Sequence, residues 1–323
     1  MPRGTTKFTA GMMLAWPGLV SIAVVGFWFA LWGVLVPSPG SVGSSLRQVA
    51  LVNPRGIAFV PSVAKLRQVF QRMDYDLETV RNGDRLVPPL YIASVPDGMG
   101  QIRQSAERKK LFLQLMLPLV LKANETVRWE RQKLLRIKRS INKRASLSDD
   151  DRAYLLEMAR HYEVRKPLVD LLLPRVDVLP VSIALAQSAI ESGWGTSRFV
   201  REGNAPFGQW TTASFDGIVP LQRDNGKTHK IRAFENLYAS VKSYIHNLNT
   251  HRAYRGFPAM RKAMRESGGQ LDSLALTVSL RAYSKKGETY IRLLQNIMTG
   301  NDLLPLDRAR LGGNFARRNG PDI

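Results

Sequence analysis

The stretch LAQSAIESGWG, Leu185 to Gly195, runs from an apolar segment into a turn that carries an acid. Small and apolar side chains precede Glu191, and the glycines on either side of Trp194 are typical of a helix that ends there. The carbonyl groups at the end of a helix carry partial negative charge, and apolar surroundings also disfavour an ionised carboxylate. We therefore expect the pKa of Glu191 to be raised.

An acid that is still protonated near neutral pH suits the cleavage of a glycosidic bond, because it can protonate the leaving oxygen. Trp194 would then form one wall of a pocket or stack on a sugar ring. The alternative that this stretch alone leaves open is an exposed glutamate at the end of a helix, without a catalytic role.

Helical periodicity continues on both sides of this stretch. Ser148 begins one helix, since Ser148 and Asp151 have the spacing of a capping box. Between Trp210 and Phe234 the pattern changes to a β-hairpin, with strands at Ile218–Leu221 and Thr228–Ile231 around a turn at residues 224–226. The other helices are expected at about Pro180–Ser192, Asn236–Thr250, Pro258–Glu266, Leu271–Tyr283 and Glu288–Thr299.

Two helices are expected upstream, at residues 62–81 and from Gln101 to about Arg144, where Pro118 would kink the second one. Residues 127–144 of this long helix hold eight basic side chains and one acidic side chain. They form either a solvated helix face or a contact surface for an acidic polymer or anionic lipid.

Residues 10–36 contain no charged side chain and are long enough to cross a bilayer as a helix, which needs about 20 residues. Arg3 and Lys7 come before them, so the positive-inside rule places residues 1–9 in the cytoplasm. A buried helix of a soluble protein is the alternative. The expected order continues with a linker at 37–60, a helical basic region at 61–146, a main domain at 147–304 and a loose tail at 305–323.

The net charge of +21 favours anionic partners, namely nucleic acid, anionic lipid or an acidic cell-wall polymer. We expect no nucleic-acid partner, because the chain has none of the usual nucleic-acid-binding motifs. The absence of cysteine excludes disulfides, thiolate metal sites and a cysteine nucleophile. The chain also lacks a Gly-rich phosphate loop, a GxSxG motif and an HExxH pair, so we expect neither a cofactor nor a metal.

The segments ESGWGTSRF and GNAPFGQW, followed by the hairpin and an amphipathic helix, resemble the glucosaminidase family (glycoside hydrolase family 73). Within this family the chain is most similar to the Bax-type membrane proteins. Their N-terminal region resembles the stretches VRNGDRLVPPLYIASVP and RKKLFLQLMLPLVL. The resemblance extends from about Val60 to Thr299.

The resemblance implies a mainly α (α+β), lysozyme-like fold with a small β-lobe and a groove between the two parts. It also implies hydrolysis of β-1,4 bonds after N-acetylglucosamine in the glycan strands of peptidoglycan. Glu191 matches the general acid of the family, and Tyr283 matches a tyrosine close to that acid. The implied substrate-binding positions are Trp194, Asn204, Phe207, Gln209, Trp210 and Gln222.

The chain departs from the family pattern at two places. The family usually reads Asn-Asn-Leu-Phe-Gly where this chain has Asn204, Ala205, Pro206, Phe207 and Gly208. Many members also carry a glutamate in the hairpin, where this chain has Gln222, which can act neither as a base nor as a nucleophile. Asp224 nearby, the more distant Asp216 or the substrate's own 2-acetamido group would then assist Glu191.

The sequence thus predicts a peptidoglycan hydrolase with a single-pass anchor in the inner membrane and its catalytic domain in the periplasm. Two alternatives remain. A lytic transglycosylase shares the lysozyme-like fold, but tends to carry Gly-Leu-Met-Gln where this chain reads FGQW at residues 207–210. A non-catalytic peptidoglycan-binding scaffold would explain Gln222, Ala205 and Pro206.

Overall fold

The computed structural model describes residues 57–211, 217–219 and 230–313. The expected membrane anchor at 10–36 and the N-terminal residues 1–9 lie outside these ranges, as do Asp216, Gln222 and Asp224. Within the described ranges, no helix combines the length and the apolar character that a membrane span requires. The described part of the chain is mainly helical, as the sequence predicts, with a small antiparallel sheet.

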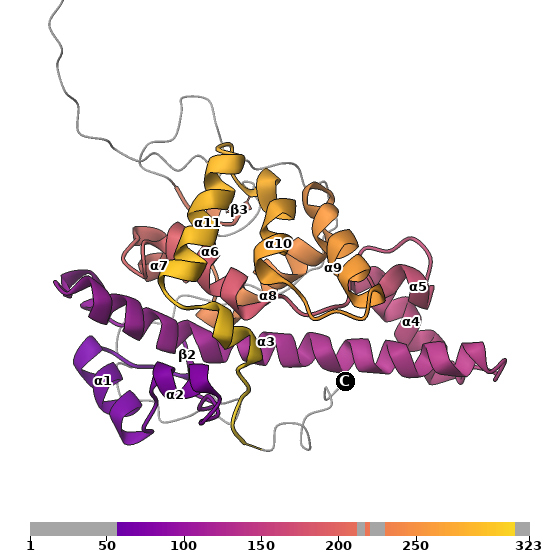
Figure 1. Ribbon diagram of the computed structural model, residues 1–323, viewed down its shortest axis with the longest axis horizontal. Helices are drawn as coiled ribbons and strands as arrows, with labels where there is room; N and C mark the ends of the chain where they lie inside the picture. Colours follow the sequence, from indigo (N-terminus) through magenta and orange to yellow (C-terminus); the bar gives the residue numbers. More distant parts are fainter. Residues whose placement is uncertain (1–56, 212–216, 220–229, 314–323) are drawn as a thin grey trace, which may run out of the picture.

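A single long helix, α3 (Ser105–Asn142), runs through the whole molecule (Figure 1). Its side chains from Leu111 to Leu121 are all buried. Two helices from the second half of the chain, α6 (Val181–Ser192) and α8 (Leu237–Thr250), pack on it. Helix α3 therefore supplies a wall of the core on which the rest of the fold is assembled, and Pro118 lies within that buried wall.

The N-terminal region contains two short helices where the sequence predicts one at 62–81. The structure has α1 (Val63–Arg72) and α2 (Leu77–Asn82), so the prediction of one helix is wrong. The break arises because Asp74 adopts a left-handed conformation with φ 48°, and because the Asp76 side chain accepts a hydrogen bond from the backbone of Glu78 and so caps α2. Strands β1 (Ile57–Ala58) and β2 (Tyr91–Ile92) pair in parallel beside these helices, and the 3₁₀ turn η1 (Met99–Gln101) leads into α3.

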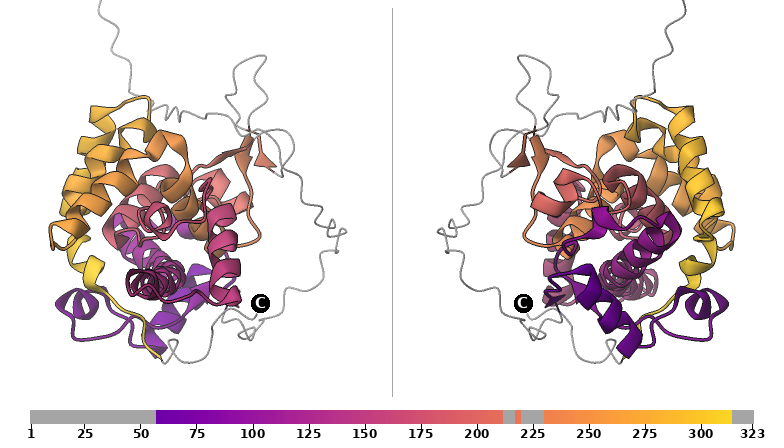
Figure 2. Two further views of the ribbon diagram at one scale, coloured as in Figure 1. Left: turned by 90° about the vertical axis from the view of Figure 1, so that its right-hand side faces the viewer. Right: turned by 90° about the vertical axis from the view of Figure 1, so that its left-hand side faces the viewer.

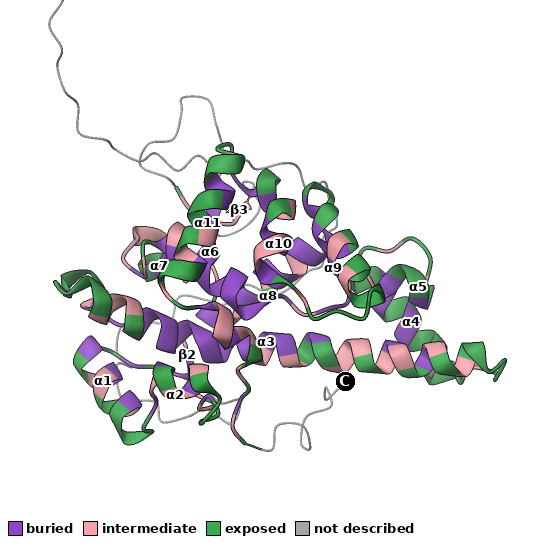
Figure 3. Cartoon of the chain, in the orientation of Figure 1, coloured by how far each residue is buried: buried purple, intermediate pink, exposed green. Residues whose placement is uncertain are grey.

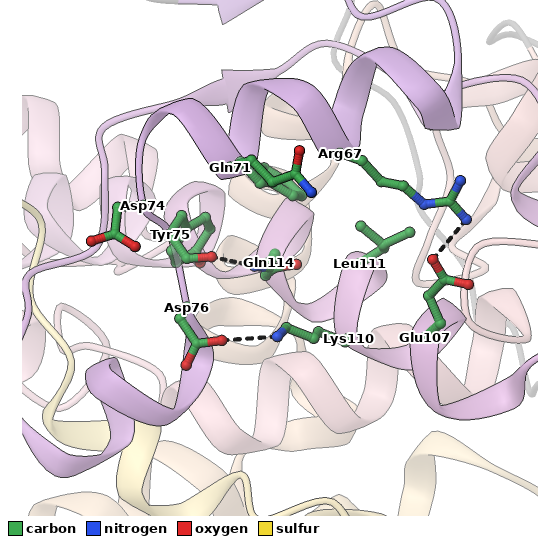
Figure 4. Close-up of a pocket in the computed structure, with 10 residues that line it drawn as sticks. Arg67, Gln71, Asp74, Tyr75, Asp76, Glu107, Lys110, Leu111 and Gln114 are labelled. Carbon is green, nitrogen blue, oxygen red and sulfur yellow. Dashed lines mark hydrogen bonds and ion pairs between the residues drawn. The ribbon is translucent and has the colours of Figure 1, made fainter.

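Polar contacts hold α1 and α2 against α3 around a hollow of about 400 Å³ (Figure 4). Arg67 of α1 forms an ion pair with Glu107 across 2.7 Å. Asp76 pairs with Lys110 across 2.8 Å, and the Gln114 amide donates a hydrogen bond to the carbonyl oxygen of Tyr75. The charged groups around this hollow therefore satisfy one another.

The helices after α3 mostly follow the sequence prediction. In the views along α3, the orange and yellow helices of the C-terminal half lie largely above it (Figure 2). The Ser148 hydroxyl accepts a hydrogen bond from the Asp151 amide across 3.1 Å, which confirms that it caps α4 (Asp149–His161). The segment expected as one helix at Leu271–Tyr283 is instead α10 (Ser273–Thr277) followed by the 3₁₀ turn η3 (Val278–Tyr283). The remaining elements are α5 (Val169–Leu172), α7 (Arg198–Gly203), η2 (Arg252–Tyr254), α9 (Gly256–Glu266), α11 (Glu288–Gly300) and η4 (Leu304–Arg308).

The small sheet has the strand order β3-β5-β4, with β3 (Trp210–Thr211) and β4 (Gly217–Ile218) on either side of β5 (Lys230–Arg232). Strands β4 and β5 pair antiparallel with Ile218 opposite Ile231, as expected for a hairpin. The turn of this hairpin lies outside the described residues. Gly217 is required here, since an added Cβ would lie 2.7 Å from the carbonyl oxygen of Ile231.

One hydrophobic core extends from Ala58 to Leu311 (Figure 3). The buried side chains before and after residue 147, where the sequence suggests a boundary, therefore pack together in one core.

The core contains a buried cluster of charged side chains around Asp177. The Asp177 carboxylate lies 3.1 Å from Arg265, 3.7 Å from Arg131 and 3.8 Å from Arg261. Burial alone would raise the pKa of Asp177, but these guanidinium groups hold it below its usual value.

Candidate active site

Three successive residues in the left-handed conformation end α6 shortly after Glu191. Gly193, Trp194 and Gly195 have φ values of 57°, 59° and 81°. The Trp194 amide closes the helix by donating to the carbonyl oxygen of Ala189, and the Gly195 amide donates to the Ser192 hydroxyl. Gly195 must be glycine for a second reason, because an added Cβ would lie 3.0 Å from the ring of Phe112. The turn is thus locked against α3 directly after the acid.

Glu191 is partly buried in the last turn of α6, and its carboxyl group faces α11. The Tyr290 hydroxyl donates a hydrogen bond to Oε1 across 3.2 Å. Burial raises the pKa of Glu191 from 4.5 to about 7, although the hydrogen bond from Tyr290 acts in the opposite direction. The raised pKa favours the protonated form of Glu191 at a higher pH than for an exposed glutamate.

A chain of three hydrogen bonds reaches Glu191 from inside the protein. The Tyr244 hydroxyl donates to Oε1 of Gln187 across 2.5 Å, and Nε2 of Gln187 donates to the Tyr290 oxygen across 2.9 Å. Since the amide nitrogen can only donate, the single proton of the Tyr290 hydroxyl is directed towards Glu191. The chain fixes the position of Oε1 and leaves Oε2 as the oxygen without this partner.

Aromatic rings surround the acid on the protein side. The ring of Tyr283 stacks on that of Tyr290 with centroids 5.6 Å apart, and its hydroxyl donates to the carbonyl oxygen of Phe207. Phe207 in turn stacks on Tyr244 at 3.8 Å. The ring of Tyr254 lies 5.7 Å from that of Tyr283, and burial and the negative charge of Glu191 raise the pKa of Tyr254 to about 12. The site is therefore a partly buried carboxyl group backed by phenols.

The loop after α7 approaches Glu191 through Gly208. This glycine has φ 60°, and an added Cβ would lie 3.6 Å from Oε2 of Glu191. The Gly208 amide donates to the carbonyl oxygen of Ala205, so a tight turn spans Pro206 without needing a donor from it. The departure of this chain from the usual Asn-Asn-Leu-Phe-Gly pattern is thus accommodated in a closed turn.

The other predicted binding residues in this loop make contacts that position it. Asn204 ends α7 in the left-handed conformation, and its amide donates to the carbonyl oxygen of Phe234. The Gln209 amide donates to the Ser243 hydroxyl of α8 across 3.2 Å. Trp210 is partly buried and begins β3. Phe207 is fully buried, so its ring supports the site from behind.

Trp194 directly follows the end of α6 and contacts α3. Its ring packs edge-on against Phe112 of α3 with centroids 6.0 Å apart, and the Lys109 ammonium group lies 5.0 Å from it. The structure therefore brings Glu191, Tyr283 and Phe207 together, with Asn204, Gln209 and Trp210 in the adjoining loop, and places Trp194 against α3. Gln222 and Asp224 lie outside the described residues, so their roles stay predictions.

None of Gln187, Tyr244 and Tyr290 was identified from the sequence as a residue of the site. Gln187 did carry a usable signal, because it is a polar residue in an apolar helix and lies four residues before Glu191, on the same helix face. Tyr290 carried none, since 99 residues separate it from the acid.

Comparisons with known proteins agree with the expected family. Residues 166–303 match the model of the glucosaminidase family, described as mannosyl-glycoprotein endo-beta-N-acetylglucosaminidase. The chain is 32% identical to protein bax of Escherichia coli (strain K12) over 218 residues, which cover 66% of this chain and 76% of that protein. It is 37% identical to the peptidoglycan hydrolase FlgJ of Salmonella typhimurium over 70 residues, 19% of this chain and 22% of that protein. No solved structure is significantly similar.

Proposed function

Because the chain belongs to the glucosaminidase family, as a glycoside hydrolase of the Bax type, we propose that it cleaves peptidoglycan with Glu191 as the general acid. The observation that carries this proposal is the environment of Glu191, a partly exposed carboxyl group whose pKa burial raises to about 7. The similarity to a peptidoglycan hydrolase supports the choice of substrate.

The two carboxyl oxygens of Glu191 have different tasks in this mechanism. Tyr290 holds Oε1, so the proton resides on Oε2, beside Gly208. A glycosidic oxygen that enters next to Gly208 receives this proton as its bond to the sugar carbon breaks. A general acid is most effective with a pKa near the working pH, which the buried position of Glu191 provides.

A second group must stabilise the cationic sugar that forms when the bond breaks. In our proposal Asp224 in the hairpin or the 2-acetamido group of the substrate performs this task, and cleavage follows N-acetylglucosamine. The proposal for Asp224 rests on its place in the sequence, two residues from Gln222, where many family members carry a glutamate.

We further propose that residues 10–36 anchor the chain in the inner membrane, with the catalytic domain in the periplasm. The support is the uncharged length of this segment and the basic residues before it. Protease added to intact spheroplasts should digest the domain while residues 1–9 stay protected. Protection of the whole chain would contradict this orientation.

The decisive experiment is mass spectrometry of the fragments that the full chain, in mild detergent, releases from purified sacculi. We expect reducing N-acetylglucosamine ends, and we expect Glu191→Gln to lower the rate by about 10²- to 10⁴-fold. Glu202→Gln is the matched control, because Glu202 is an exposed glutamate on α7. A loss of only a few-fold for Glu191→Gln would contradict the proposed role of Glu191.

The products also decide between the alternatives. Anhydromuramic ends would identify a lytic transglycosylase, and binding to sacculi without any soluble product would identify a scaffold. Loss of activity in Asp224→Asn would assign the second group to Asp224. An unchanged rate in Asp224→Asn and in Asp216→Asn would assign it to the acetamido group of the substrate.

A further inference from the structure

A second hollow of about 490 Å³ lies between α3, α4 and α8, and we call it the lateral pocket. Its floor is apolar, formed by Ala123, Val127 and Ile245. Polar and charged side chains surround this floor, contributed by all three helices: Thr126, Glu130, Arg160, His161, Lys242 and His246. An apolar floor with a polar rim is the usual composition of a site that binds a small polar ligand.

The positive charge of the lateral pocket comes from Lys242 and Arg160. His246 donates a ring hydrogen bond to the carbonyl oxygen of His161, and the two rings lie 4.8 Å apart. Burial, His246 and Lys242 lower the pKa of His161, which favours the neutral form of this ring. Within the described part of the chain, neither Lys242 nor Arg160 forms an ion pair, and both residues are exposed. The Lys242 ammonium group lies 5.1 Å from the ring of Tyr238, and an anion can still reach it from the solvent side. Two cations at the rim are thus available to an anionic ligand.

A carboxyl group lies on the other side of the same pocket. The Tyr162 hydroxyl donates a hydrogen bond to Oε2 of Glu130 across 2.5 Å, and burial raises the pKa of Glu130. The second oxygen of Glu130 can accept a hydrogen bond from a ligand amine. The hollow in Figure 4 offers no such unpaired groups at these positions, because Arg67 pairs with Glu107 and Lys110 pairs with Asp76.

The lateral pocket is connected to the candidate active site through Ser243. This residue lines the pocket and also accepts a hydrogen bond from Gln209, which directly follows Gly208 beside the Glu191 carboxyl group. Tyr244, the next residue of α8, begins the hydrogen-bond chain that ends on Glu191. The hydrogen bond between Gln209 and Ser243 thus joins the wall of the lateral pocket to the loop beside Glu191.

We propose that the lateral pocket binds the peptide stem of a peptidoglycan strand. Stem peptides carry carboxylates, which would face Lys242 and Arg160, and a diamino acid whose ammonium group would face Glu130. This inference rests on the proposed function, since it takes peptidoglycan as the substrate. It assigns recognition of the peptide to a place separate from the acid that cleaves the glycan.

Nuclear magnetic resonance of the histidine rings tests this proposal without relying on activity. The full chain has only four histidines, and His161 and His246 line the pocket whereas His251 lies beside Tyr254. In the Glu191→Gln protein in detergent, a synthetic stem tetrapeptide with a diamino acid should shift the His161 and His246 signals and leave His251 unchanged. The same peptide with its carboxylates amidated should cause no shift.

Substitutions at the rim supply the second arm. Lys242→Met together with Arg160→Met should weaken peptide binding about tenfold, the combined effect of removing two exposed cations. Lys262→Met, an exposed lysine on α9, is the matched control and should bind as before. The proposal is overturned if millimolar peptide leaves both histidines unshifted, or if the double variant binds as tightly as the control.

The outcomes separate this proposal from the proposed function. If the protein binds the peptide but releases nothing from sacculi, the proposed peptide site stands and the proposed hydrolase function is wrong. If the protein cleaves sacculi with the Glu191 dependence described above but binds no peptide, the proposed function stands and the proposed peptide site is wrong.

Discussion

The Tyr290 hydroxyl donates a hydrogen bond to Oε1 of Glu191 across 3.2 Å, joining α11 to the last turn of α6. This bond favours the ionised carboxylate, whereas burial favours the protonated acid, and burial prevails. The protonation state of the candidate acid thus depends on a residue that the sequence does not mark.

Replacing Tyr290 by Phe should raise the pKa of Glu191 further and move the basic limb of the pH–rate profile to higher pH, because the carboxylate loses its donor. It should also cost about 1–3 kcal/mol of unfolding free energy, since the Gln187 amide loses its acceptor in a buried position. Activity against pH and urea unfolding measure the two effects. Tyr254→Phe is the control, and a basic limb that moves equally in both variants would contradict the assignment.

Glu191 should make stability depend on pH. The folded protein keeps the Glu191 proton up to about pH 7, whereas the unfolded chain releases it near 4.5. The stabilisation is therefore complete below about pH 4.5 and is lost as pH rises through 7. Glu191→Gln should be more stable than the wild type at pH 8, by about 3 kcal/mol at most. Urea unfolding at pH 5 and pH 8 checks this, and an equal difference at both would refute it.

Gly208→Ala should impair catalysis more than folding. The left-handed backbone costs about 1–2 kcal/mol for any residue with a Cβ, and the new methyl group would lie 3.6 Å from Oε2 of Glu191, where the substrate must enter. Gly83→Ala is a matched control, because Gly83 has φ 84° and nothing lies within 4 Å of its added Cβ. We expect similar losses of melting temperature and a fall in kcat/KM of about 10- to 100-fold for Gly208→Ala alone. Equal activity of the two variants would show that the substrate does not pass Gly208.

Asp177→Asn should destabilise the fold strongly. The side chain of Asp177 is only 3% exposed and faces three arginines, of which Arg261 is fully buried. Removing the carboxylate leaves buried guanidinium groups without a counter-charge, which costs about 3–5 kcal/mol. Asp170→Asn removes only an exposed ion pair with Lys138 and should cost less than about 1 kcal/mol. Denaturant unfolding of both variants measures the difference, and comparable losses would be the contrary result.

The parts of this structure that the sequence predicts are those with local causes. Pro180 and Gly193 delimit α6, and the carbonyl end and apolar residues around Glu191 are visible within a dozen positions. The break between α1 and α2 was missed because it depends on the left-handed Asp74, which no periodicity reveals. The contact of Tyr290 with Glu191 is set by tertiary packing across 99 residues, which no local pattern can encode.

Helix α3 determines how much of this chain must be transferred together if the enzyme is grafted into another protein. The segment that matches the glucosaminidase family begins at residue 166, after α3 has ended. A graft limited to that segment would leave the faces of α6 and α8 that pack on α3 exposed to water. Recombination that preserves a folded enzyme must therefore join this chain upstream of Ser105, so that the scaffold and the catalytic segment are inherited as one unit.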